Sequence, residues 1–192
     1  YNRLTGEIEA ITANPFNGAE DLNVCFINHD SYGNVWIGVE NHGILLMNSS
    51  TKQVVQQLSL QDIKVNFSHP FLLNNQFAKS KDSIFLCTSD GLRLCKYENG
   101  KYRIADLNPD LKKFETVEIR CMTGAKNGGL WIGTNNGLYF LNNKTHQYDL
   151  IRHVPGLPGT LLDNYINSVF IDSFNNTWII TTKGLNLLRR EE

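Results

Sequence analysis

The sequence lacks the features that mark nucleic-acid-binding proteins and membrane spans. Its 18 basic and 19 acidic residues nearly cancel, leaving a net charge of −1, whereas binding to nucleic-acid phosphates needs a basic stripe. The sequence has no run of about 18 apolar residues, the length that a membrane-spanning helix requires. We therefore expect no nucleic-acid partner, and a link to a membrane only through parts of the protein beyond these residues.

Cysteine is scarce, and no two cysteines have the close spacing of metal ligands. Cys87 and Cys95 fall on the two strands of one expected hairpin. Pairing Thr88 with Leu92 puts Cys87 opposite Arg93, so the two sulfurs are diagonal neighbours at best and a bridge is disfavoured. We expect all the cysteines to be buried free thiols, which behave as small hydrophobic groups. They are Cys25, Cys87, Cys95 and Cys121.

Motifs that carry enzyme chemistry are also missing. The sequence has no Gly-x-Ser-x-Gly, no phosphate-binding glycine loop and no His-Glu-x-x-His. Asp30 and Asp172 could act as a catalytic pair only if the fold brought them together, and their positions in equivalent turns favour turn capping instead. The histidines lack metal-ligand spacing. We expect no enzyme activity, no metal and no cofactor in this segment.

What the chain does contain is one pattern repeated four times. Residues 130–141 read Leu-Trp-Ile-Gly-Thr-Asn-Asn-Gly-Leu-Tyr-Phe-Leu, which is an apolar β-prone run, a turn and a second apolar run. Asparagine and glycine in the turn can adopt the positive φ that a hairpin needs. The other copies lie at residues 35–47, 84–94 and 177–188.

The spacing of these copies indicates a β-propeller. The aromatic residue that opens each hairpin recurs at intervals of 49, 46 and 47 residues, at Trp36, Phe85, Trp131 and Trp178. A period in the mid-forties with several strands per unit is typical of propeller blades. An aromatic side chain that every blade requires is a packing element rather than a platform for sugars, so we expect these four in the core between blades.

The Trp-Ile-Gly-Thr run followed by Gly-Leu resembles the two-component-regulator propeller repeat. Residues 119–142 and 166–188 resemble it closely, residues 24–47 well, and residues 71–96 poorly, because Phe85 replaces Trp and Cys87 replaces Gly. Arrays of these repeats form the extracytoplasmic sensor region of hybrid two-component systems, best known in Bacteroides-type bacteria. The resemblance implies an all-β propeller with four-stranded antiparallel blades, in the periplasmic portion of an inner-membrane sensor kinase.

We expect one propeller segment without a domain linker, which is either about four blades or a four-blade part of a larger propeller. The repeats cover approximately residues 22–60, 71–107, 117–152 and 165–190. Residues 1–11 align with the outer strand of a preceding or closing blade. Tyr1 is not an initiator methionine, so we interpret the sequence as a piece of a longer protein.

The fourth unit lacks an outer strand, which leaves three arrangements open. Residues 5–11 pair beside residues 184–190 and close a four-bladed ring, or two copies join in a larger ring, or the segment is an open part of a larger propeller. Open sheet edges are templates for pairing with another chain. Self-association, such as a homodimer, is therefore favoured over an open monomer and over a closed ring.

For function, the resemblance implies a sensor that responds to oligosaccharides, with the rest of the sensor protein as its partner. The alternative is a propeller scaffold for protein–protein interactions without a small-molecule ligand. Propellers place variable chemistry in loops on one face, and amide and aromatic groups there pair with sugar hydroxyls and stack on sugar rings. We predict ligand contacts from the irregular second unit and the longer turn of the first. The residues are Asn41, His42, Asn66, His69, Asn74 and Asn75.

Overall fold

The computed structural model describes residues 23–64, 77–80, 82–125, 128–142 and 144–189. Within these ranges the chain forms fifteen β-strands and one short 3₁₀ helix, η1 (Lys112–Phe114). No helical segment in this part of the chain has the length and apolarity needed to cross a membrane. The expected all-β class is confirmed.

The strands form four antiparallel sheets, each of which is one blade. Blade 1 contains β1 (Val24–His29), β2 (Asn34–Val39), β3 (Gly43–Asn48) and β4 (Val54–Leu58). Blade 2 contains β5 (Phe77–Ser80), β6 (Ser83–Thr88), β7 (Gly91–Glu98) and β8 (Lys101–Ala105). Blade 3 contains β9 (Ile119–Gly124), β10 (Leu130–Thr134), β11 (Gly137–Asn142) and β12 (Gln147–Ile151). Blade 4 has three strands in the described residues, β13 (Ile166–Ile171), β14 (Thr177–Thr181) and β15 (Gly184–Leu188).

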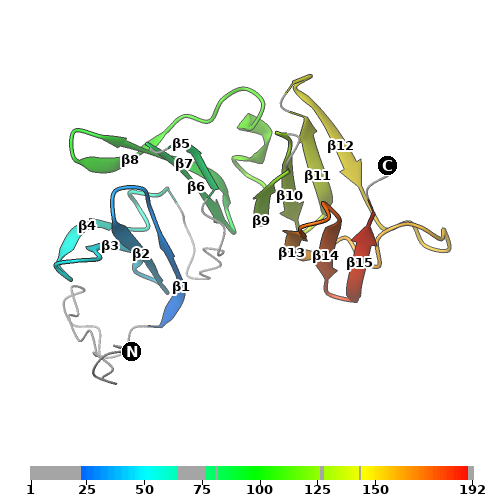
Figure 1. Ribbon diagram of the computed structural model, residues 1–192, viewed down its shortest axis with the longest axis horizontal. Helices are drawn as coiled ribbons and strands as arrows, with labels where there is room; N and C mark the ends of the chain where they lie inside the picture. Colours follow the sequence, from blue (N-terminus) through cyan, green and yellow to red (C-terminus); the bar gives the residue numbers. More distant parts are fainter. Residues whose placement is uncertain (1–22, 65–76, 81, 126–127, 143, 190–192) are drawn as a thin grey trace.

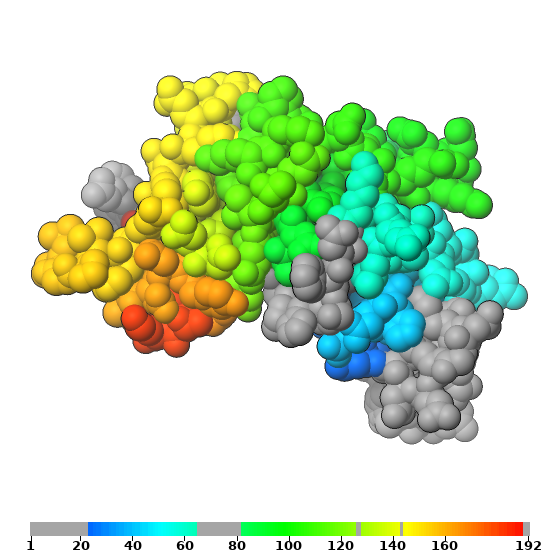
Figure 2. Space-filling model, turned by 180° about the vertical axis from the view of Figure 1, so that it is seen from behind, coloured from blue at the N-terminus to red at the C-terminus, as the bar shows by residue number. Residues whose placement is uncertain are grey.

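The blades fan out along an open arc (Figure 1). Neighbouring strands in each sheet are consecutive in the chain, and the first strands of the blades lie toward the inside of the arc, where β13 packs beside β9. Blades 1 and 4 lie at opposite ends, a separation that the view from behind also shows (Figure 2). The predicted architecture, a β-propeller segment of antiparallel blades, is therefore confirmed.

A threonine and a glycine close the turn between the second and third strands of a blade. Thr134 Oγ1 donates a hydrogen bond to the Gly137 carbonyl at 2.8 Å, and Thr88 makes the same bond to Gly91 at 2.5 Å. Gly137 has a φ of 120°, whereas the two asparagines before it keep negative φ. Glycine alone thus supplies the positive φ of this turn, since it has no Cβ to oppose that conformation.

The register of the second hairpin differs by one residue from the prediction. Thr88 pairs with Gly91, and Cys87 pairs with Leu92. The bond from Thr88 fixes a two-residue turn, and the register of a hairpin follows its turn. The predicted pairing of Thr88 with Leu92 is therefore wrong.

Three of the cysteines occupy the predicted environment. Cys87, Cys95 and Cys121 are buried free thiols, and burial raises the pKa of both Cys95 and Cys121 to about 12. Cys25 is only half-buried, because it lies on the innermost strand of blade 1, which is partly exposed.

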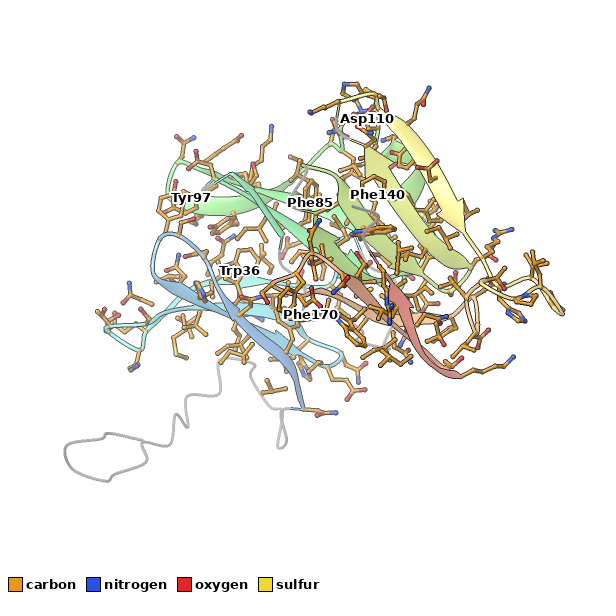
Figure 3. The ribbon with its side chains drawn as sticks, turned by 45° about the vertical axis from the view of Figure 1, so that its right-hand side comes forward. Trp36, Phe85, Tyr97, Asp110, Phe140 and Phe170 are labelled. Atoms are coloured by element: carbon orange, nitrogen blue, oxygen red, sulfur yellow. The ribbon has the colours of Figure 1, made fainter. Side chains whose placement is uncertain are left out.

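The hydrophobic core lies between blades. Trp36, labelled in Figure 3, packs against Tyr102 of blade 2. The centroids of the two rings lie 4.6 Å apart. Phe85 and Trp131 are buried at the next two boundaries. Trp178 departs from the prediction because it is only half-buried. Among the described residues, no further blade covers the side of blade 4 that carries it.

An aspartate in the turn before β2 anchors the first boundary. Asp30 accepts bonds from the Asn34 backbone and side-chain nitrogens, each at 2.9 Å, and from Trp36 Nε1 at 3.1 Å. The Tyr102 hydroxyl of blade 2 donates a further bond to Asp30 Oδ2 at 2.9 Å. Burial on its own would raise the pKa of Asp30, but the bonds from Asn34, Trp36 and Tyr102 outweigh burial and hold the pKa below its usual value.

Blade 4 repeats this arrangement, in which an aspartate accepts hydrogen bonds from an asparagine and a tryptophan. Asp172 accepts bonds from the Asn176 backbone and side-chain nitrogens at 2.8 and 2.9 Å, and from Trp178 Nε1 at 3.0 Å. These bonds hold the pKa of Asp172 below its usual value. The predicted turn-capping role is thus confirmed for both aspartates, and each also holds an indole, which the sequence did not indicate.

Arg93 ties the segments between blades together. Its guanidinium donates to the carbonyls of Ile63 at 3.2 Å and Lys64 at 2.8 Å, in the segment that leaves blade 1. It also donates to the Glu115 carbonyl at 2.8 Å, just before blade 3. One side chain of β7 therefore fixes the backbone on both sides of blade 2.

Candidate functional site

Polar side chains recur at one rim of the arc, where the innermost strands begin. In blade 1, the Asn23 side chain before β1 donates to the Glu40 carboxylate in the turn after β2. In blade 3 the roles are exchanged, because Asn135 Nδ2 in the turn donates to Glu118 Oε2 before β9 at 3.1 Å. Equivalent positions thus carry an amide and a carboxylate in both blades, and we call this feature the polar rim.

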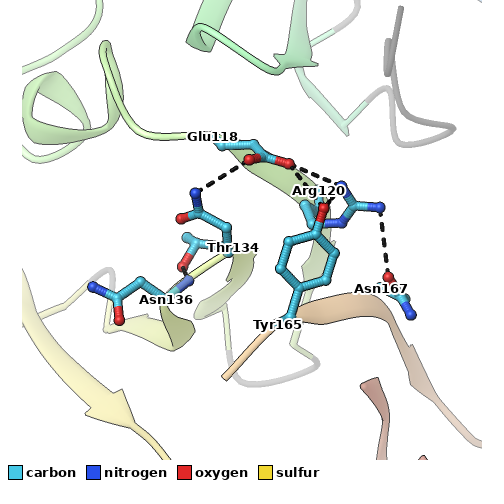
Figure 4. Close-up of polar contacts among 7 residues, drawn as sticks. Glu118, Arg120, Thr134, Asn136, Tyr165 and Asn167 are labelled. Atoms are coloured by element: carbon cyan, nitrogen blue, oxygen red, sulfur yellow. Dashed lines mark hydrogen bonds and ion pairs between the residues drawn. The ribbon is translucent and has the colours of Figure 1, made fainter. Parts of the chain in front are cut away.

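The rim is most elaborate at the boundary between blades 3 and 4 (Figure 4). Arg120 Nη1 in β9 contacts Glu118 Oε1 at 2.8 Å and the Tyr165 hydroxyl at 2.6 Å. Its Nη2 lies 3.5 Å from Asn167 Oδ1, and its guanidinium carbon lies 4.3 Å from the centre of the Tyr165 ring. Charge-assisted hydrogen bonds and cation–π contact together hold the guanidinium in one position.

The repeat itself explains why these residues meet. Glu118 and Tyr165 are 47 residues apart, as are Arg120 and Asn167, the same interval that separates Trp131 from Trp178. Each pair therefore occupies equivalent positions, in or just before the innermost strands β9 and β13, which lie side by side. Arg120 is the extra residue of a β-bulge in β9, because Thr134 pairs with Ile119 and Gly133 pairs with Cys121.

The chemistry of the rim suits a polar, neutral ligand. The Glu118–Arg120 ion pair balances its own charge, with side chains 24% and 10% exposed. Around it stand amide groups and a phenol that can donate or accept hydrogen bonds. Nearby, the Thr182 hydroxyl donates to Asp163 and lowers the pKa of that carboxyl. In the described ranges, no group of three or more His, Cys, Asp or Glu side chains could hold a metal ion.

Two of the predicted site residues lie beside the polar rim. Asn41 is exposed, with a φ of 61°, and His42 is half-buried, with Nδ1 2.6 Å from the Glu40 carbonyl oxygen. Both belong to the turn that carries the rim residue Glu40. The other four, Asn66, His69, Asn74 and Asn75, lie outside the described residues.

Sequence reasoning missed the residues of the boundary between blades 3 and 4. A usable signal was present, because Arg120 is a single charge inside an apolar strand segment and its partner stands one repeat later. The predicted Asn74 precedes Arg120 by 46 residues, the interval between Phe85 and Trp131. The prediction thus chose the corresponding position in another repeat.

Apart from the polar rim, a concave site lies between blades 1 and 2. A cavity of about 290 Å³ is lined by tyrosines and amides, and most of these groups already bond within the protein. Gln56 donates to the Tyr102 carbonyl at 2.7 Å and accepts from the Tyr102 backbone nitrogen at 2.8 Å. Asn48 Oδ1 caps the turn at Ser50 and Thr51. We interpret this cavity as part of the boundary between the two blades.

The fold and the polar rim together define a β-propeller segment that carries polar side chains along one rim. Residues 114–136 match the family model described as the two-component regulator propeller. The predicted resemblance is confirmed over that stretch, which includes Glu118, Arg120 and Asn135. No curated protein matches the chain.

Solved structures share the fold. The extracellular domain of the hybrid two-component system BT4673 of B. thetaiotaomicron aligns with a TM-score of 0.64 and 21% identity, over 93% of this chain and 23% of that one. PorZ, a surface component of the type-IX secretion system of Porphyromonas gingivalis, aligns at 0.58 and 17% identity, over 86% and 26%. The WD40 propeller domain of Doa1 aligns at 0.55 and 14% identity, over 88% and 51%. The chain thus spans about a quarter of the length of the two bacterial structures.

Proposed function

We propose that this chain is a ligand-sensing part of the periplasmic region of a hybrid two-component sensor kinase, and that it responds to oligosaccharides. The observation that carries the proposal is the match of residues 114–136 to the two-component regulator propeller, because the same stretch supplies the polar rim. The similarity to extracellular domains of B. thetaiotaomicron sensor systems supports the location outside the cytoplasm. The segment itself binds and does not catalyse, and the rest of the sensor protein is its partner.

In this proposal the sugar hydroxyls bond to the amides and to the Glu118–Arg120 pair. A balanced ion pair presents both donors and acceptors without a net charge, which favours neutral sugars over charged ones. Tyr165 lies against the guanidinium and fixes its orientation. Asn41 and His42 extend the rim on blade 1.

The test is a panel of neutral and acidic oligosaccharides, titrated by calorimetry against the wild-type chain and three variants. We expect Arg120→Met and Asn135→Ala to weaken binding by about tenfold or more, because each removes hydrogen bonds to a buried polar ligand. The matched control is Arg103→Met, which removes an exposed arginine of β8, away from the rim. Wild-type affinity in both rim variants would exclude the rim as the binding site.

The alternative function is a scaffold for protein–protein interactions. It predicts that no member of the panel binds, while a protein partner binds the wild-type chain and loses affinity for rim variants. Asn41→Ala can be tested against both the oligosaccharides and the protein partner, because the Asn41 side chain is exposed and its loss leaves the core intact.

A further inference from the structure

The cavity between blades 1 and 2 lies at the opposite end of the strands from the polar rim. The rim residues stand where β1 begins and β2 ends. The cavity lies where β1 turns into β2, at Tyr32, and where β7 turns into β8, at Gly100. Its volume of about 290 Å³ is close to the lower end of the range for small-molecule sites. A ligand held there would be separate from one held at the rim.

Three tyrosine rings line this cavity in a row. The ring of Tyr97, labelled in Figure 3, has its centroid 4.1 Å from that of Tyr32 and 4.9 Å from that of Tyr102. Tyr102 is fully buried, whereas Tyr32 is 37% exposed and its hydroxyl donates to Asp82 of blade 2. The row is therefore anchored in the core at one end and reaches solvent at the other.

The repeat does not require all of these rings. Tyr102 recurs as Tyr148 in blade 3, at the same distance of 11 residues from the turn glycine, as expected of a residue that packs one blade on another. Tyr97 follows the turn glycine of its blade by six residues, and the same position holds Ser49 in blade 1 and Asn143 in blade 3. The packing of the blades therefore accounts for Tyr102 but does not call for Tyr97.

Polar atoms around these rings have hydrogen-bonding capacity left. Within the part of the chain that the structure describes, the Tyr97 hydroxyl and Asn48 Nδ2 have no hydrogen-bond partner. Gln56 Nε2 donates one hydrogen to the Tyr102 carbonyl and keeps a second. None of the described residues that line the cavity carries a charge. The cavity thus offers two amide donors and a hydroxyl that can donate or accept.

Leu46 and Val55 add apolar surface to the cavity. Val55 is 49% exposed and is the extra residue of a β-bulge in β4, because Leu46 pairs with Gln56 and Met47 pairs with Val54. A bulge changes the direction of a side chain, and bulges are common beside functional sites. Aromatic rings, aliphatic groups and uncharged hydrogen-bonding groups therefore meet in one cavity.

We propose that this cavity binds one neutral pyranose unit of a saccharide, at the opposite end of the strands from the polar rim. The C–H face of the sugar lies against Tyr32 and Tyr97, and its hydroxyls bond to Asn48, Gln56 and the Tyr97 hydroxyl. A phosphate, sulfate or uronate is disfavoured, because burying an ionised group without an opposite charge costs free energy. The inference does not depend on the role proposed for the rim, because the two sites share no residue.

Saturation-transfer difference NMR of the whole chain tests the proposal with the methyl glycosides of glucose, galactose, mannose and N-acetylglucosamine at millimolar concentration. We expect at least one of these sugars to receive saturation from the protein. Tyr97→Phe, which removes only the hydroxyl, should then weaken binding about threefold or more. Tyr97→Ser, which removes the ring, should weaken it about tenfold or more, and Ser49 shows that this position of the repeat accepts serine. The proposal is wrong if no sugar receives saturation.

Two neighbouring valines supply a matched pair of variants. Val55→Met narrows the cavity, whereas Val54→Met changes an exposed valine that does not line it. Both should keep the wild-type melting temperature, because both side chains are exposed, and only Val55→Met should weaken binding of the sugar. Equal affinity of the two variants would overturn the proposal.

The rim variant Arg120→Met separates this site from the proposed function. If Tyr97→Ser loses affinity for a sugar that Arg120→Met and Asn135→Ala still bind as the wild type does, the cavity is the binding site for that sugar and the rim is not. If Arg120→Met loses affinity and Tyr97→Ser keeps it, the sugar occupies the rim, so the proposed function holds and the inference about the cavity is wrong.

Discussion

At the scale of single residues, the glycine of the repeated Trp-Ile-Gly run and the residue that pairs with it across the sheet have complementary sizes. Gly38 pairs with Phe26, and a Cβ on Gly38 would overlap the phenylalanine ring. In blade 4 the sizes are reversed, because Ile180 pairs with Ser168. The pair keeps a similar total volume, and cores tolerate such swaps better than a change on one side.

Some turn positions require glycine for two reasons, because the φ angle is positive and because another part of the backbone lies too close for a Cβ. Gly91 has a φ of 125°, and a Cβ there would overlap the carbonyl oxygen of Glu115, whereas Gly100 has a φ of 81° and open space around it. We expect Gly91→Ala to lower the free energy of unfolding by more than about 2 kcal/mol, and Gly100→Ala by only about 1 kcal/mol. Urea denaturation of both variants measures the difference. Equal losses would show that the approach of Glu115 contributes nothing.

The Asp30 carboxylate gives a pH-dependent prediction. Its pKa is lowered in the folded state, so its contribution is complete above the unfolded value of about 3.9 and is lost as the pH falls through that value toward the folded pKa. Asp30→Asn should therefore reduce stability at pH 7 and flatten the decline of the melting temperature below about pH 5. The control is Asp149→Asn, on the exposed strand β12, which should keep the wild-type profile. If the melting temperature of Asp30→Asn fell below pH 5 as steeply as that of the wild type, the stabilising role of the Asp30 carboxylate would be contradicted.

At the scale of elements, Arg93 joins segments that are distant in the sequence. Its half-buried guanidinium donates to backbone carbonyls before and after blade 2, and burial lowers its pKa. We expect Arg93→Met to cost about 2–3 kcal/mol, since several bonds to a charged donor are lost together. Arg103→Met, an exposed change, should stay within about 0.5 kcal/mol. Thermal melting of the two variants decides, and similar melting temperatures would refute the role of Arg93.

The sequence predicted those features that depend on interactions between residues close together in the chain. The repeat gave the strands, the order of the hairpins and the glycine turns, because alternation and turn chemistry act over a few residues. The register of the second hairpin was missed because the bond from Thr88 to Gly91, which shortens the turn, leaves no mark in the apolar pattern.

The candidate site was less accessible from the sequence. Arg120 and Tyr165 meet only because two innermost strands are neighbours, and the contact spans 45 residues. The prediction of Trp178 as a core residue was wrong for a related reason, since its burial depends on what covers the exposed apolar side of β14 and β15. Contacts between repeats need the arrangement of the blades, which composition and periodicity do not contain.

At the scale of the whole molecule, the apolar cores between consecutive blades imply nearest-neighbour coupling. A blade that touches only the sheets beside it is stabilised by them, as in other repeat proteins. Blades 1 and 4 each have one such neighbour in the described structure, whereas blades 2 and 3 have two. Cooperative unfolding of the chain should therefore begin at the two end blades.

Native-state hydrogen exchange can observe this order directly. Amides of β14 and β15 should exchange through openings of lower free energy than those of β6 and β10, by about 2 kcal/mol or more. Uniform protection across these strands would mean that the chain opens as one unit. If the gradient exists, blade 4 works as a reporter, because anything that binds the exposed apolar side of β14 and β15 should slow the exchange of these amides before it changes any other part of the molecule.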